Sequence, residues 1–301
     1  MLWGSDLLLR PPLLHLGWSA AGVVLWEHLL LAAIFVVPLW RGRSALGSLS
    51  LRQWGALLFV AWGGSALATW LYTTSFTLGQ PLFPILLQKT QPVFALSLAG
   101  WLLKERRASF FWVWCAAALA GAFGLLGIRT GPSWADAHWQ QAACALGAAA
   151  LWGASTVAGR SLIPLVPPAT LAGARFALAL PPLLAAALLS SQGKAATMAH
   201  NHQGTAWLLL LLLVLLPDIL GMTCYYQGLR KTTASVATLA ELCYPLSALL
   251  LGLTTLHAHL AAGQWLGLTL LIGSVLRLGV RPHVASETRP AEPIPALAPL
   301  A

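Results

Sequence analysis

Apolar runs of about 20 residues recur along the whole chain, separated by short gaps that hold most of the charged residues. An α-helix of that length crosses the roughly 30 Å hydrocarbon core of a bilayer. Inside lipid every backbone N–H and C=O must be bonded within the protein, which a helix achieves by itself. The recurring runs therefore predict an all-α integral membrane protein.

The composition supports the same conclusion. Of the 301 residues, 58% are hydrophobic and only 8% are charged. A soluble domain has about 25% charged residues, so a water-soluble globule of this size could not cover its surface with these side chains. The formal charge of +9 could suggest nucleic acid, but the basic residues form no single patch. We expect no nucleic-acid partner and expect the lipid bilayer to surround the chain.

About ten membrane helices are predicted. Their approximate ranges are 1–17, 20–40, 53–75, 80–103, 108–128, 139–163, 168–190, 206–229, 232–256 and 261–281. The Pro/Ala-rich tail that follows, 282–301, reads as disordered. The chain opens "MLWGS", whereas the comparable "LWGAS" comes about a dozen residues into the sixth helix. Either the first helix is short or the protein starts upstream.

Basic residues give the orientation. They concentrate in alternate gaps, namely at Arg41, Arg43, Arg52, Lys104, Arg106, Arg107, Arg230, Lys231, Arg277, Arg281 and Arg289. The other gaps contain only Arg129 and Lys194. Because loops rich in Lys and Arg stay in the cytoplasm, both termini are predicted to be cytoplasmic, in a multi-pass protein of the plasma or inner membrane.

The two halves of the chain resemble each other at an offset of 153 residues. Residues 72–103 align with 225–256 without a gap, so that Tyr72 meets Tyr225 and Pro92 meets Pro245. A repeat with five helices enters the bilayer from opposite sides in its two copies. Inverted repeats are common in secondary transporters, which bind substrate near the midplane where the repeats meet.

These residues also carry a family resemblance. The pattern of Tyr, an apolar stretch and x-x-Pro occurs in both 72–92 and 225–245, and "WLLKER" (101–106) ends the fourth helix. "WGAS" (152–155) and "ARF" (174–176) follow in the second half. In these motifs the chain resembles the drug/metabolite transporter superfamily, in its EamA-type branch.

The resemblance covers nearly the whole chain. It implies ten helices and movement of small organic solutes by alternating access. The expected organisation is a first EamA-type repeat at 1–128, an outer linker at 129–138, a second repeat at 139–281 and the cytoplasmic tail at 282–301. Two segments depart from the family pattern: "LTTLHAH" (253–259) stands where a glutamate is common, and "LWEH" (25–28) where an arginine is usual.

Charged side chains inside the predicted helices are the main candidates for a site, because a charge at the bilayer centre costs about 2.5–3.5 kcal/mol on insertion scales. They are Glu27, Lys89, Arg175, Asp218 and Glu241. Lys89 and Glu241 lie near mid-depth in helices that correspond in the two repeats. They form either a substrate or proton-coupling site or an ion pair that only fixes the packing.

The other three charges leave similar alternatives. Asp218 could exchange protons or be neutralised by Arg175 or Lys89. Glu27 could serve a site or form a static pair with Arg10. Arg175 could hold an anionic group or pair with Asp218.

Two prolines adjoin this candidate cavity. Pro92 and Pro245 lack an N–H, which frees the carbonyl four residues earlier, at Gln88 and Glu241. Each break either lines a cavity or shapes packing. Gln88, Gln91, Tyr72 and Tyr225 complete the expected lining, and Trp62 and Trp70 are weaker candidates.

No enzyme, cofactor or metal signature is present. There is no phosphate-binding glycine loop and no zinc-type spacing of His, Glu or Cys. "GQWLG" (263–267) permits close helix contact, within the chain or in a homodimer.

The sequence thus predicts a secondary transporter of small metabolites, amino-acid- or drug-like, driven by substrate or proton gradients and working as an exporter. The alternatives are an importer of the same solutes, or a membrane scaffold or enzyme without transport.

Overall fold

The computed structural model describes residues 2–102, 109–125, 139–190, 203–221, 253–254 and 260–280. Every regular element in this part of the chain is helical. Among these described residues, four helical stretches are long and apolar enough to cross a membrane: Leu51–Ser75, Trp139–Gly159, Pro168–Leu189 and Gln203–Gly221. The all-α membrane architecture predicted from the sequence is confirmed, whereas the count of ten helices includes 232–256, which lies largely outside the described residues.

The N-terminal part consists of short helices joined by tight turns. A 3-10 turn, η1 (Leu2–Ser5), leads into α1 (Asp6–His15), and α2 (Ala20–Ile34) follows. Gly17 takes a φ of 92° between them, a conformation that only glycine adopts without steric cost. The Ser19 hydroxyl then accepts a hydrogen bond from the Gly22 N–H at 3.0 Å and caps α2.

The predicted helix 20–40 is divided in two. After α2 the chain turns at Phe35 and continues as α3 (Val36–Arg41), followed by α4 (Arg43–Gly47). Pro38 lacks the N–H that would bond to the carbonyl of Ile34, which explains the interruption at this point.

The third membrane helix is continuous but changes its winding. It starts at a capping box, in which Ser50 and Gln53 each bond the other's backbone N–H. It runs as α5 (Leu51–Phe59), a π-helical segment η2 (Val60–Leu67) and α6 (Ala68–Ser75).

The fourth helix is interrupted where its polar residues lie. It consists of α7 (Leu82–Leu87), a 3-10 segment η3 (Gln88–Thr90) and α8 (Gln91–Leu102). The carbonyl of Gln88 accepts from the Gln91 N–H instead of from position 92, which is proline. The polar run therefore coincides with a local change of helix type.

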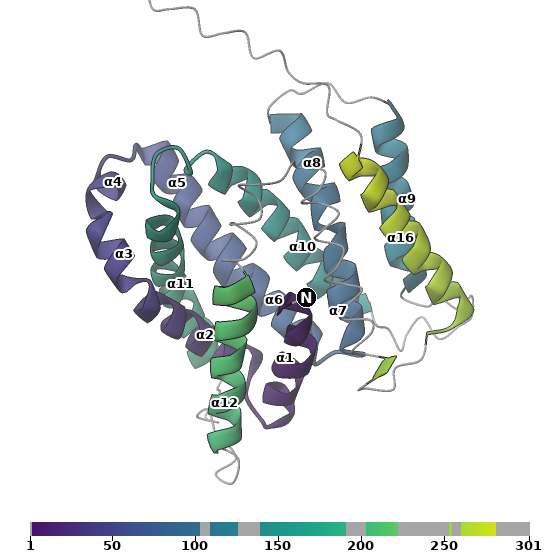
Figure 1. Cartoon of the computed structure of the whole chain (residues 1–301), viewed down its shortest axis with the longest axis horizontal. Helices are drawn as coiled ribbons and strands as arrows, with labels where there is room; N and C mark the ends of the chain where they lie inside the picture. Colours follow the sequence, from purple (N-terminus) through teal and green to yellow (C-terminus); the bar gives the residue numbers. More distant parts are fainter. Residues whose placement is uncertain are drawn as a thin grey trace, which may run out of the picture.

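The remaining helices are longer. They are α9 (Ser109–Leu125), α10 (Trp139–Arg160), α11 (Pro168–Ser190), α12 (Gln203–Leu213) with the π-helical η6 (Val214–Gly221), and α16 (Ala262–Val280). Figure 1 shows α10 in the interior of the bundle, and it packs against α6, α8 and η2.

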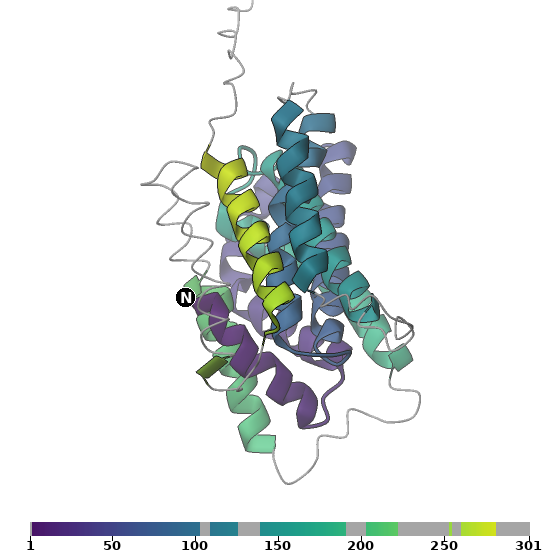
Figure 2. The same cartoon turned by 90° about the vertical axis from the view of Figure 1, so that its right-hand side faces the viewer.

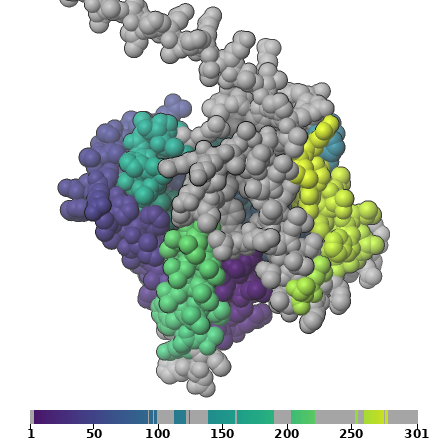
Figure 3. Space-filling view, viewed as in Figure 1, coloured from purple at the N-terminus to yellow at the C-terminus, as the bar shows by residue number. Residues whose placement is uncertain are grey.

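Two groups of helices surround α10. On one side α2 packs along α11, and α1 packs along α12, on the face shown in Figure 3. On the other side α9 and α16 run side by side in both views (Figures 1 and 2). A Cβ placed on Gly121 of α9 would lie 2.5 Å from the backbone nitrogen of Leu271 in α16. The "GQWLG" segment thus contributes Gly267 to a close helix contact within the chain.

The lateral surface is apolar, as a lipid-facing surface must be. Large side chains such as Leu189 (76% exposed) and Leu266 (73% exposed) lie on it. A shallow apolar groove with a cavity volume of about 480 Å³ is lined by Trp70, Pro182, Ala185, Ala186 and Leu189.

Candidate functional site

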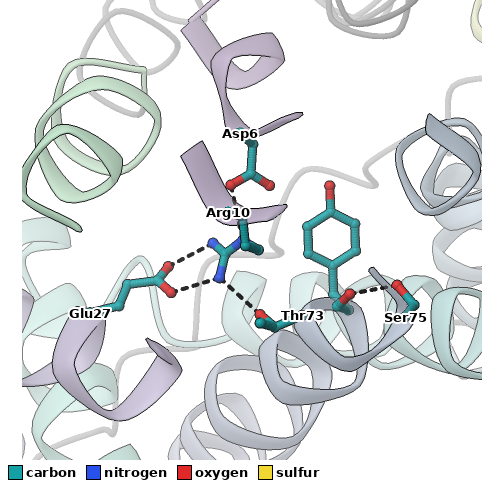
Figure 4. A network of polar contacts seen from close by, with 6 residues as sticks. Asp6, Arg10, Glu27, Thr73 and Ser75 are labelled. Carbon is teal, nitrogen blue, oxygen red and sulfur yellow. Dashed lines mark hydrogen bonds and ion pairs between the residues drawn. The ribbon is translucent and has the colours of Figure 1, made fainter. Parts of the chain in front are cut away.

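A buried polar network lies where α1, α2 and α6 meet (Figure 4). Arg10 of α1 is at its centre and is 4% exposed. Its Nη1 and Nη2 donate to the two carboxylate oxygens of Glu27 in α2, at 2.9 and 3.1 Å. This two-pronged arrangement is the strongest geometry available to an arginine and a carboxylate.

The same guanidinium has two further partners. Its Nε donates to Oδ1 of Asp6, one helical turn earlier, at 3.0 Å, and its Nη1 donates to the Thr73 hydroxyl of α6 at 2.9 Å. The ring of Tyr72 lies 5.8 Å from the Arg10 Cζ. Because these residues belong to three helices, the network ties α1, α2 and α6 together.

A fourth helical segment, η6, adds Asp218 to the network. Its carboxyl group lies beside that of Glu27, with Arg10 and Asp6 close by. The Oδ2 atom of Asp218 is buried and has no hydrogen-bond partner among the residues that the structure describes. The cluster therefore combines three carboxyl groups, from Asp6, Glu27 and Asp218, with the single guanidinium of Arg10.

Arg175 occupies a second polar position, on α11. Its Nε donates to the Ser65 hydroxyl of η2 at 2.7 Å, and its guanidinium lies 5.4 Å from the ring centre of Phe176. Phe176 also makes an edge contact with His28, at 5.5 Å between ring centres. His28 follows Glu27 in α2, so α2 and α11 carry the two polar positions on neighbouring helices.

The predicted site residues fall into three groups. The first group consists of Glu27, Tyr72 and Asp218, which lie together in the network, and Arg175, which lies at the second polar position. Glu27 takes the arrangement in which it pairs with Arg10, and Asp218 lies with Glu27 while Arg175 bonds Ser65.

The polar run of the fourth helix forms the second group. Gln88, Lys89 and Gln91 are partly buried around η3, and the Gln88 Oε1 atom is buried with no hydrogen-bond partner in the described ranges. The third group, Glu241, Tyr225 and Pro245, lies outside the described residues, as does any contact between Lys89 and Glu241. Position 92 lies in the first turn of α8.

Three members of the network, Asp6, Arg10 and Thr73, were not among the predicted site residues, although Arg10 was named as a possible partner of Glu27. Asp6 and Arg10 are four residues apart, the spacing of an ion pair on one helix face, so a signal for that pair existed. Thr73 gave no such signal, because only the packing of α6 against α1 brings it to Arg10. Trp62, a weaker candidate, is 51% exposed and donates its indole N–H to the Leu178 carbonyl at 3.0 Å.

Comparison with known proteins identifies the family of the chain. A family model described as "EamA-like transporter family" matches residues 2–127 and again residues 140–279. The chain belongs to the EamA-like transporter family. The two matches confirm the internal repeat and the predicted family, whose name describes transporters.

Two individual proteins are similar to the chain. "Riboflavin transporter ImpX" of Fusobacterium nucleatum subsp. nucleatum (strain ATCC 23726 / VPI 4351) is 29% identical over 202 residues. That match covers 64% of this chain and 64% of the relative. A solved structure described only as "Crystal structure of protein" has a TM-score of 0.55 and 21% identity, covering 91% of this chain and 93% of the other. At this identity the second likeness shows the fold alone.

Proposed function

We propose that this EamA-like protein is a secondary-active transporter that moves small organic metabolites, amino-acid- or drug-like, by alternating access between two inverted repeats. One observation carries the proposal: the buried network of Asp6, Arg10, Glu27 and Asp218 lies where helices of both halves of the chain meet. A scaffold has no need of four ionisable groups in the interior of a membrane bundle, where each is costly.

The proposed direction is export from the cytoplasm, with the solute site reached from both sides in turn. The proposed orientation, with both termini cytoplasmic, is supported by the arrangement in Figure 1. There α4 and the C-terminal ends of α8 and α16 lie at the same end of the bundle. Basic residues concentrate in the gaps at that end, which is expected of the cytoplasmic side.

Counterflow into proteoliposomes tests the function. A panel of amino acids, amines, organic acids and riboflavin, the last named for its similar relative, is offered to vesicles preloaded with the same solute. We expect accumulation of at least one solute above protein-free vesicles. An absence of counterflow for every solute would contradict the proposal. An applied proton gradient of either sign then shows the coupling and the direction.

The proposed coupling residues have their own test. With a solute from the panel that carries no amino group, Asp218→Asn or Glu241→Gln should abolish gradient-driven accumulation while exchange continues, because each removes a carboxyl that could carry a proton. Arg43→Ala is the control, since Arg43 is exposed, lies outside the network and donates to the Trp40 carbonyl beside it. Full gradient-driven accumulation in both carboxyl variants would exclude them from coupling.

Lys89 has a separate proposed role in the cavity, opposite Glu241. Lys89→Ala should abolish flux while the protein still reaches the membrane. The charge swap of Lys89→Glu with Glu241→Lys should restore folding better than either change alone. It should restore flux only if the pair is structural. Wild-type flux in Lys89→Ala would remove the lysine from the cavity.

A further inference from the structure

The two π-helical segments occupy corresponding places in the two repeats. η2 covers Val60–Leu67 and η6 covers Val214–Gly221, which agrees within one residue with the 153-residue offset of the repeat. π-Helical turns are rare and often lie at functional sites. At the same offset, Ser65 of η2 corresponds to Asp218 of η6.

The residues that face these two positions also correspond. Glu27 is the eighth residue of α2 and Arg175 is the eighth residue of α11, and these are the second helices of the two repeats. Arg175, on the second helix of the second repeat, contacts Ser65 on the third helix of the first repeat. Glu27, on the second helix of the first repeat, contacts Asp218 on the third helix of the second repeat. The two contacts are thus versions of one arrangement.

The two versions differ in charge. At η2 the Arg175 guanidinium donates to the Ser65 hydroxyl at 2.7 Å, so the hydrogen-bond acceptor there has a cationic donor. At η6 two carboxyl groups meet, and both oxygens of Glu27 already accept from Arg10. Within the described part of the chain, the Oδ2 atom of Asp218 is left as a buried acceptor with no hydrogen-bond partner.

Such an acceptor is costly. The Asp218 carboxyl group shares a hydrogen bond with that of Glu27, but a buried carboxyl oxygen without a donor, such as Oδ2, loses its hydration and gains nothing in return. Among the described residues, the only cation in this network is Arg10, against three carboxyl groups, and His28 bonds the Val24 carbonyl through Nδ1 at 2.9 Å. In that part of the chain no three His, Cys, Asp or Glu side chains are arranged to hold a metal ion. A charged organic donor fits this place better than a metal does.

We propose that the Oδ2 atom of Asp218 accepts a hydrogen bond from a protonated amine of the transported solute, which would supply at η6 the cationic donor that Arg175 supplies to Ser65 at η2. This inference rests on the proposed transport function and narrows its substrate class to solutes that carry a cationic hydrogen-bond donor. The Tyr72 ring, which lies 5.8 Å from the Arg10 Cζ in the same network, makes edge contacts with Phe76 and Trp152 at 5.0 and 5.2 Å, so an aromatic amine is a suitable probe.

The experiment compares two probes of nearly the same shape, phenylethylammonium and 2-phenylethanol. Their binding to the purified full-length protein in nanodiscs is measured by calorimetry. We expect the wild type to bind the cation at least tenfold more tightly than the alcohol, since a charge-assisted hydrogen bond is worth about 1.5–3 kcal/mol. Asp218→Asn should make the two affinities equal.

Two further variants keep the test decisive. Asp218→Ser copies the residue of the other repeat and should also remove the preference. Arg43→Ala changes an exposed residue outside the network, so the preference should persist. Because Asp218 has no partner to lose at Oδ2, Asp218→Asn should unfold at or above the wild-type temperature, and only the wild type should be stabilised by the amine.

Equal affinity for the two probes in the wild type, including no measurable binding of either, would overturn the inference. That result is also expected if Asp218 holds only a proton. A preference that persists in both Asp218 variants would overturn it too. Counterflow of neutral or anionic solutes without amine preference would leave the proposed function standing, whereas amine preference without any flux would contradict the function instead.

Discussion

Arg10 is a guanidinium held away from water, and its contacts explain how the chain tolerates it there. Four hydrogen bonds join it to Asp6, Glu27 and Thr73. Removing one partner of a buried ion pair leaves the other as an uncompensated charge, which is far more costly than never having had the pair. Arg10 is therefore expected to be the most sensitive single position of the network.

Arg10→Ala should lower the free energy of unfolding by about 3–5 kcal/mol, because Glu27 and Asp6 are left buried without their cation. Reversible unfolding of the reconstituted protein in mixed micelles measures this loss. Arg43→Ala is the matched control. Arg43 is exposed and lies 4.3 Å from the Trp40 ring centre, an interaction worth about 0.5–1 kcal/mol. Equal losses in the two variants would show that burial of Arg10 adds nothing.

At this scale the sequence predicted part of the site. Glu27 and Asp218 could be found because a carboxyl inside an apolar run is conspicuous. The pairing of Glu27 with Arg10 was one of two alternatives, since the sequence alone could not tell whether α1 lies against α2. The contact between Glu27 and Asp218 could not be predicted, because it depends on how helices from the two halves of the chain pack.

Helices in this protein are shaped by proline and by close packing. Pro38 and Pro217 each free a carbonyl four residues earlier, at Ile34 and Leu213, and there α2 and α12 end. Apolar runs and prolines can be read from the sequence, so the extents of most described helices were predicted well, such as 168–190 for α11. It could not predict η2, where no proline occurs and the change from α to π winding involves one additional residue per turn.

The contact between α9 and α16 offers a test at the level of elements. A Cβ on Gly121 would lie 2.5 Å from the Leu271 nitrogen and 2.7 Å from the Gly267 carbonyl oxygen. Backbone atoms cannot move aside as a side chain can, so Gly121→Ala should force the helices apart and cost about 1–3 kcal/mol of stability.

Gly273→Ala on α16 is the control for this change, since nothing lies within 4 Å of its Cβ position. There the better helix propensity of alanine should raise stability by up to about 1 kcal/mol. Thermal unfolding in the same detergent measures both. A change of the same sign in the two variants would mean that α9 and α16 do not depend on this close contact.

The whole molecule is a bundle whose polar interior is built from both repeats. α2 packs along α11, which brings Glu27 and His28 of the first half near Arg175 and Phe176 of the second. Asp218 reaches Glu27 from η6. Since the charged positions come from corresponding helices of the two halves, the site depends on how the two halves are placed relative to each other. The inversion of the second repeat relative to the first remains a prediction.

The orientation in the membrane tests the inversion directly, because two five-helix repeats in sequence must cross from opposite sides. Single cysteines are placed in a background without the four native ones, at Ser48 between α4 and α5, where the chain is exposed, and at Asn201. The positive-inside rule places Ser48 in the cytoplasm and Asn201 outside. A membrane-impermeant maleimide should label Asn201→Cys in intact cells and Ser48→Cys only after permeabilisation. Labelling of both from the same side would exclude the proposed topology, and the reverse pattern would invert the proposed orientation while keeping the two positions on opposite faces.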